Sequence, residues 1–158
     1  MIARFLCPLF SALLCMTAAA QLDNIVKIGD GCTSGFRPIF GLSGTTRPGG
    51  TLYCGIGTSI GSALFYNCPL FLGASRTRWG NLTLPYNLAA LGSPSCWLQI
   101  SLDVMVFNTG SPPVHTCTIN IPNNKGLIGG VLYAQWIVPL NGAPWVLTTD
   151  AYAITIDP

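Results

Sequence analysis

Apolar and polar residues alternate one by one along the second half of this chain, as they do in a strand with one buried face. The longest such run predicts a strand over Trp97–Phe107, and Val114–Ile121 predicts another. Between them lies Asn108–Pro113, a loop rich in turn-forming residues. We therefore expect the two strands to pair as a long antiparallel hairpin. The positions expected to point inward are Leu98, Ile100, Leu102, Val104, Val106, Cys117, Ile119 and Ile121.

The remaining segments also favour strands over helices. Leu127–Pro139 is hydrophobic on both faces, which is typical of a central strand, and Trp145–Ile156 predicts the last strand. Thr51–Thr58 and Ala63–Leu72 predict a strand pair around a glycine-rich turn. We expect at most one short helical turn, near residues 86–91. Closely spaced strands with Gly and Pro turns indicate an all-β fold, an antiparallel β-sandwich or jelly-roll-like arrangement.

The first twenty residues depart from this pattern and have the features of a secretory signal peptide. A basic residue precedes the apolar run Phe5–Met16, and small residues lead to a cleavage position between Ala20 and Gln21. A membrane anchor would need about 20 apolar residues, and a lipoprotein site at Cys15 would need a small residue where Leu14 stands. We expect a signal peptide at 1–20 and a single β-sandwich domain at 21–158 with no transmembrane segment. Its expected location is secreted, at the cell surface or periplasmic.

The mature chain carries little charge. The whole sequence has seven Lys and Arg residues against five acidic ones, and removing Arg4 with the signal peptide leaves six basic side chains. The resulting net charge near +1 (six minus five) comes without a basic cluster. Nucleic-acid binding depends on concentrated phosphate neutralisation, and docking to an anionic membrane needs a basic segment. We therefore expect neither.

Five cysteines remain once the signal peptide is removed, and in an exported protein they are disulfide candidates. Because five is odd, at most two bridges form within one chain, and one thiol is left as a buried, interchain or reactive cysteine. The spacing of cysteines and of the single histidine suggests no metal site, and we expect no cofactor. The five are Cys32, Cys54, Cys68, Cys96 and Cys117.

One short motif points weakly to an enzyme. Gly57-Thr58-Ser59-Ile60-Gly61 matches the G-x-S-x-G pattern of hydrolases, and Asp103 and His115 follow it in the order of a Ser–Asp–His triad. That mechanism needs a helix directly after the serine, whereas the following residues predict a strand. We therefore expect a tight hairpin there and no catalytic residues, with Ser59, Asp103 and His115 kept as the weak alternative.

Aromatic residues give the best hint of a binding site, because exposed Trp and Tyr on a β-face are common where sugars or proteins bind. The alternative for each of them is a place in the core. Asn81-Leu82-Thr83 also forms an N-glycosylation sequon, which matters only if the source glycosylates exported proteins. The candidate ligand-binding residues are Trp79, Tyr133, Trp136 and Trp145.

The order of several short motifs resembles a group of small secreted β-domains found in planctomycetes and other marine bacteria. The motifs are Gly29-Asp30-Gly31-Cys32, then Leu84-Pro85-Tyr86-Asn87-Leu88 running on to Gly92 and Cys96, then Ile121-Pro122-Asn123, Leu127-x-Gly129 and Gln135. The resemblance implies a bacterial exported domain with a β-sandwich fold and a Cys32–Cys96 bridge. It brings no functional residues, and it leaves the pairing among Cys54, Cys68 and Cys117 open.

Together these features favour a secreted, non-enzymatic β-domain with a binding or structural role at the cell surface or in the extracellular matrix. Its partner would be an unknown glycan or protein. The alternatives are a secreted serine hydrolase using Ser59, and a disulfide-linked, self-assembling coat or matrix subunit, which would be a homo-oligomer.

Overall fold

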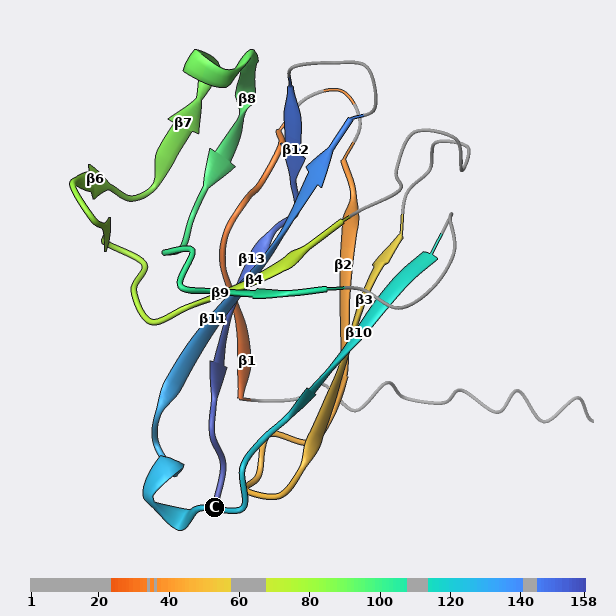
Figure 1. Cartoon of the computed structure of the whole chain (residues 1–158), viewed down its shortest axis with the longest axis vertical. Helices are drawn as coiled ribbons and strands as arrows, with labels where there is room; N and C mark the ends of the chain where they lie inside the picture. Colours follow the sequence, from red (N-terminus) through yellow and green to blue (C-terminus); the bar gives the residue numbers. More distant parts are fainter. Residues whose placement is uncertain (1–23, 34, 36, 58–67, 108–113, 141–144) are drawn as a thin grey trace, which may run out of the picture.

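The alternating segments form an antiparallel all-β sandwich, which confirms the predicted fold class (Figure 1). The computed structural model describes residues 24–33, 35, 37–57, 68–107, 114–140 and 145–158. The predicted signal peptide at 1–20 lies outside these residues. Within them the regular structure consists of strands and two short 3₁₀ turns.

The larger sheet has six strands, and the smaller one has three. The order in the larger sheet is β1 (Ile25–Gly29), β13 (Ala151–Thr155), β11 (Val131–Pro139), β4 (Leu70–Gly73) and β9 (Val104–Val106), with β12 (Val146–Thr148) paired to β11. The order in the smaller sheet is β10 (Val114–Asn120), β3 (Thr51–Gly57) and β2 (Ile39–Gly44). Two ribbons complete the fold: β5 (Arg78–Trp79) with β6 (Leu82–Thr83), and β7 (Tyr86–Leu88) with β8 (Ser93–Leu98).

Aromatic contacts join the two sheets through the core. Phe40 of β2 packs edge-on against Trp136 of β11, with ring centroids 6.1 Å apart, and against Tyr152 of β13 at 5.2 Å. Leu52 and Ile56 of β3 are fully buried in the same hydrophobic cluster. Because edge-to-face aromatic pairs add about 0.5–1.5 kcal/mol beyond area burial, this cluster fixes how the smaller sheet sits on the larger one.

The predicted strand Trp97–Phe107 is wrong as a single element. It is divided into β8 and β9, and the residues between them break the alternation because Ile100 and Ser101 are both buried. The cause is Gln135 of β11, a fully buried side chain. Its Oε1 accepts from Gln99 N at 2.9 Å, and its Nε2 donates to Trp97 O at 3.0 Å. The first bond satisfies the backbone just past the end of β8, and the second adds to the bond that Trp97 O accepts from the Thr148 hydroxyl at 3.1 Å. Val104, expected inside, is therefore exposed.

The predicted hairpins are also wrong, although the predicted faces of the second strand are confirmed. β9 pairs with β4 in the larger sheet, while β10 pairs with β3 in the smaller one. Likewise β3 and β4, expected to pair, lie in different sheets. On β10, His115 and Cys117 are buried and Thr116 is exposed, in the predicted alternation. Strand pairing across the sandwich is decided by tertiary packing rather than by nearness in sequence.

Leu127–Pro139 does supply the central strand β11, which has strands on both sides. It begins at Val131 because Lys125–Leu127 form the 3₁₀ turn η3 and Gly129 adopts a φ of 82°. A second turn, η2, spans Ala89–Leu91 inside the predicted 86–91 region. The expectation of at most one helical turn is therefore wrong. The predicted last strand, Trp145–Ile156, is interrupted between β12 and β13 at Thr149-Asp150.

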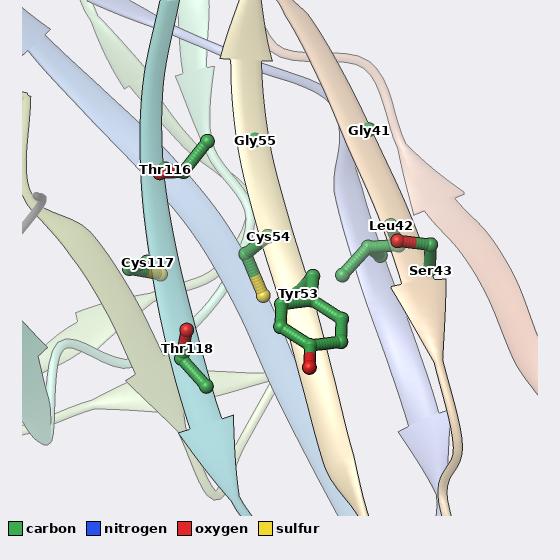
Figure 2. A pocket seen from close by; sticks show the side chains of 9 residues that line it. All are labelled: Gly41, Leu42, Ser43, Tyr53, Cys54, Gly55, Thr116, Cys117 and Thr118. Carbon is green, nitrogen blue, oxygen red and sulfur yellow. The ribbon is translucent and has the colours of Figure 1, made fainter. Parts of the chain in front are cut away.

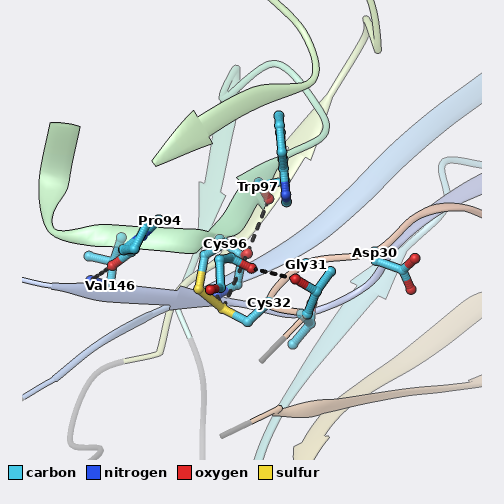
Figure 3. The surroundings of a disulfide bond; sticks show 12 residues. Asp30, Gly31, Cys32, Pro94, Cys96, Trp97 and Val146 are labelled. Carbon is cyan, nitrogen blue, oxygen red and sulfur yellow. Dashed lines mark hydrogen bonds between the residues drawn. A yellow bond between two sulfur atoms is a disulfide. The ribbon is translucent and has the colours of Figure 1, made fainter. Parts of the chain in front are cut away.

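A disulfide joins Cys32 to Cys96, as the family resemblance implied. Figure 3 shows it between the segment after β1 and β8. Backbone hydrogen bonds flank it on both sides, from Trp97 N to Gly31 O at 3.2 Å and from Thr33 N to Ser95 O at 2.8 Å. The bridge therefore ties the β7–β8 ribbon to the edge of the sandwich.

Candidate functional site

The outer face of the smaller sheet is the most unusual surface of the described residues. Along β3 the inward positions Leu52, Cys54 and Ile56 are buried, as strand alternation requires. The outward positions are Tyr53, which is 57% exposed, and Gly55. A strand in a sandwich normally carries polar side chains on its outer face. Here a large aromatic side chain stands beside a residue with no side chain.

The strand register extends this pattern across the whole sheet. Gly41 of β2 is the partner of Gly55, and we call this pair the glycine floor. In the next row, Ser43, Tyr53 and Thr118 lie side by side. Figure 2 shows the tyrosine ring between the hydroxyl groups of Ser43 and Thr118, next to the bare glycine floor.

These residues enclose a shallow hollow of about 480 Å³. None of its nine lining residues carries a charge, and four of them bear a hydroxyl group. The hollow is lined by Gly41, Leu42, Ser43, Tyr53, Cys54, Gly55, Thr116, Cys117 and Thr118.

The fold itself does not require the glycine floor. Neither Gly41 nor Gly55 is among the glycines with positive φ. A Cβ added at Gly41 would meet only Gly55 O, at 3.9 Å, and one at Gly55 would come no closer than 3.9 Å to any neighbour. Both are ordinary contacts. Since a glycine inside a strand costs about 0.5–1 kcal/mol relative to alanine, and often marks a place where a ligand approaches closely, these two positions point to binding.

The structure describes two of the three hydrolase candidates, which lie in different sheets, and does not describe the third. Ser59 lies outside the described residues. Asp103 lies next to β9 in the larger sheet, where its carboxylate accepts from Ala74 N and from the Ser101 hydroxyl, each at 2.7 Å. The hydrogen bond from Ala74 N, and to a smaller extent the one from the Ser101 hydroxyl, holds the pKa of Asp103 below its usual range. His115 is buried on β10 in the smaller sheet. Asp103 thus has a structural task, fixing the turn after β4.

The four aromatic candidates do not gather at one place. Trp136 is fully buried in the core, so its selection as a ligand-binding residue is wrong: the central strand β11 is covered on the side from which it projects. Tyr133, also on β11, is half-buried. Trp79 lies on the β5–β6 ribbon, at the opposite side of Figure 1 from β10. Trp145 is 51% exposed and lines a separate hollow of about 230 Å³ beside Gly92.

Several of the few charges are used in one ion-pair network near the disulfide. The Asp150 carboxylate contacts Lys27 Nζ and an Arg37 guanidinium nitrogen, both at 2.8 Å, and Asp30 contacts the same two cations. Partial burial alone would raise the pKa of Asp150, but the hydrogen bonds from Lys27 and Arg37 outweigh it and lower that pKa. The network joins β1 to the β12–β13 connection and lies outside the hollow.

The three cysteines outside the disulfide are all buried. Burial raises the pKa of the Cys68 thiol to about 11, so this thiol stays protonated and unreactive at neutral pH. An interchain bridge through any of the three would require the sandwich to open. Among the described residues no group of three or more His, Cys, Asp or Glu side chains is arranged to hold a metal ion.

No family model, curated protein or solved structure matches this chain. Within the described residues, no helix is long and apolar enough to cross a membrane.

Sequence reasoning missed the hollow. Its signal is the alternation in Thr51–Gly57, where Tyr53, Gly55 and Gly57 share one face. That alternation indicates a binding surface only when Gly41 is known to pair with Gly55. The strand β2 that carries Gly41 was not predicted, because Gly41 and Gly44 lie within its six residues.

Proposed function

We propose that this chain is an exported, non-enzymatic binding domain that takes a neutral glycan on the outer face of β2, β3 and β10. The observation that carries the proposal is the glycine floor, two paired strand glycines that neither backbone conformation nor internal packing requires.

The lining of the hollow suits a sugar better than other ligands. A tyrosine ring offers an apolar face for the C–H face of a sugar ring and a hydroxyl group for hydrogen bonding. Ser43 and Thr118 supply further hydroxyl groups that can both donate and accept. The absence of charge among the nine lining residues favours an uncharged ligand over a phosphorylated or sulfated one.

The place of action follows from the sequence rather than from the hollow. The signal-peptide pattern of residues 1–20 and the likeness to secreted bacterial β-domains support export. The Cys32–Cys96 disulfide fits an oxidising compartment. We therefore propose that the domain is secreted, attached at the cell surface or in its matrix, or periplasmic.

A glycan array, combined with a pull-down from cell-envelope material, tests this function. We expect signals from neutral oligosaccharides, and Tyr53→Ala should weaken binding about tenfold, the loss of one aromatic contact of roughly 1.4 kcal/mol. Trp145→Ala is the matched control, because it removes an equally exposed aromatic residue from a different surface.

Three results would count against the proposal. A folded protein that binds nothing on the array or in the pull-down argues against a binding role. A dimer in sedimentation that Gly55→Val converts to monomer assigns the face to a second copy of the chain. Labelling of Ser59 by a serine-directed fluorophosphonate probe would favour the hydrolase instead.

A further inference from the structure

Two of the buried thiols face each other across the strands beneath the hollow. Cys54 of β3 is the direct register partner of Cys117 of β10. Both side chains point to the core, and they are 1% and 3% exposed. Figure 2 shows the two residues on neighbouring strands, next to Gly55 and Thr116.

This placement meets the requirements for a disulfide bond. Directly opposed residues of antiparallel strands have Cα atoms about 4.5–5.5 Å apart, and disulfides join Cα atoms about 4.4–6.8 Å apart. The two side chains share one face of the sheet, so their Cβ atoms lie on the same side. Interaction with the neighbouring Cys117 thiol, followed by burial, raises the pKa of Cys54.

Cys68, the third unpaired thiol, does not share this arrangement. It lies just before β4, where the neighbouring Pro69 O accepts from Ile137 N of β11 at 3.1 Å. That bond holds the segment to the larger sheet. Cys68 is itself fully buried. Of the three possible pairings left open by the sequence, only one places two cysteines opposite each other in the register of a single sheet.

We propose that Cys54 and Cys117 form a second intrachain disulfide, which crosses from β3 to β10 on the core side of the sheet, under the hollow. The oxidant is an external disulfide of the exported compartment, acting by thiol–disulfide exchange. The two cysteine thiols give up two protons and two electrons and form one S–S bond. The S–S bond of the oxidant breaks and takes up both protons and electrons as two thiols. Because the thiols are buried in the folded chain, exchange takes place during folding.

The bridge has a consequence for the binding face. It fixes β3 against β10 in the middle of their pairing, and so holds Tyr53 level with Thr118 and Gly55 level with Thr116. A one-residue slip would turn these side chains into the core. Cys68 is then the single thiol left over from the odd number of cysteines.

A disulfide map tests the proposal without depending on export or on glycan binding. The full chain is reduced and unfolded, then refolded in a glutathione buffer whose redox ratio is adjusted until the Cys32–Cys96 peptide pair is linked. Free thiols are blocked, and the chain is digested without reduction for mass spectrometry. We expect a linked Cys54–Cys117 peptide pair and a blocked Cys68. Blocked Cys54 and Cys117 beside an intact Cys32–Cys96 bridge, or a bridge from either to Cys68, would overturn the proposal.

A double variant separates the covalent role from packing. Cys54→Ala with Cys117→Ala should lower the urea midpoint relative to the parent chain by a larger amount in oxidised samples than in samples kept in reductant. Cys68→Ala serves as the matched control, since it deletes a buried thiol outside the pair, and its effect should be the same in both conditions. An equal loss for the double variant in both conditions would assign the pair to packing alone.

Discussion

At the scale of single residues, Asp150 shows how a nearly uncharged chain uses the charges it has. Its carboxylate is 18% exposed and accepts from Lys27 and Arg37, which are themselves about half exposed. Solvent screens such pairs, so the network contributes on the order of 1 kcal/mol. The network matters because of its position: it holds the connection between β12 and β13 to β1 and to Arg37.

Asp150→Asn should lower the free energy of unfolding by about 1 kcal/mol at neutral pH. The pKa of Asp150 is depressed in the folded state. Its contribution is therefore complete above the unfolded-state pKa of about 3.9 and is lost as the pH falls through the folded-state pKa. Urea unfolding at a series of pH values should show the two proteins converging below about pH 4. A difference that persists unchanged into strong acid would contradict this role.

The glycine floor gives a second residue-scale prediction, on stability alone. Gly55→Ala should leave stability unchanged or raise it by up to about 1 kcal/mol, because a Cβ there meets no close neighbour. Gly73→Ala is the contrasting control: its Cβ would collide with Ser101 O, so it should be strongly destabilising. Thermal unfolding of both variants measures this, and a destabilised Gly55→Ala protein would mean that the fold needs the glycine.

At the scale of elements, Gln135 explains why strands end where they do. Its side chain binds the backbone at Trp97 and Gln99 and also donates to Thr149 O at 2.9 Å. One amide thus satisfies backbone groups at two interruptions, between β8 and β9 and between β12 and β13. A buried polar group with all its partners in place fixes a unique local arrangement.

Gln135→Leu should lower the free energy of unfolding by roughly 2–4 kcal/mol, because Gln99 N and Thr149 O lose their side-chain partner and Trp97 O keeps only the Thr148 hydroxyl. Gln99→Leu provides the comparison, since the Gln99 side chain donates to Asp30 O, and the loss of this hydrogen bond should cost about 1 kcal/mol. Urea titrations of the two variants give the comparison. Equal losses would show that the buried amide is not the organising group.

At the scale of the whole molecule, the Cys32–Cys96 bridge joins residues 64 apart in sequence. A loop of this length gives roughly 4 kcal/mol of stabilisation on the chain-entropy model. Replacing both cysteines by serine should therefore lower the unfolding free energy by up to that amount while the sheets keep their pairing. Guanidinium unfolding together with circular dichroism would measure it. Loss of the β-sheet signal under native conditions would show that the bridge is needed for folding itself.

Strand faces were predictable from the sequence, whereas strand partners were not. The burial of Cys117 and the exposure of Thr116 follow from simple alternation, and the central position of β11 follows from its doubly hydrophobic run. Partner choice depends on contacts between distant segments. Alternation therefore could not reveal that β10 joins β3, or that a glutamine on β11 interrupts Trp97–Phe107.

The candidate site depended on the same missing information. Tyr53 and Gly55 are adjacent outward positions of a predicted strand, but the hollow arises only when Gly41 pairs with Gly55. Conversely, Trp136 looked attractive as an aromatic residue, and the packing of Phe40 against it placed it in the core. The Cys32–Cys96 pairing came from the order of family motifs, since five cysteines alone allow many pairings.

The central claim is that a ligand lies across the glycine floor, and the most direct test is a calorimetric titration with the best neutral oligosaccharide from the array. We expect Gly55→Val, which fills the floor, and Tyr53→Ala each to weaken binding at least about tenfold, with both proteins as folded as the parent. Trp145→Ala should bind as the parent does. Unchanged affinity in the Gly55→Val and Tyr53→Ala proteins, or loss of binding only in Trp145→Ala, would show that the ligand does not lie on the glycine floor.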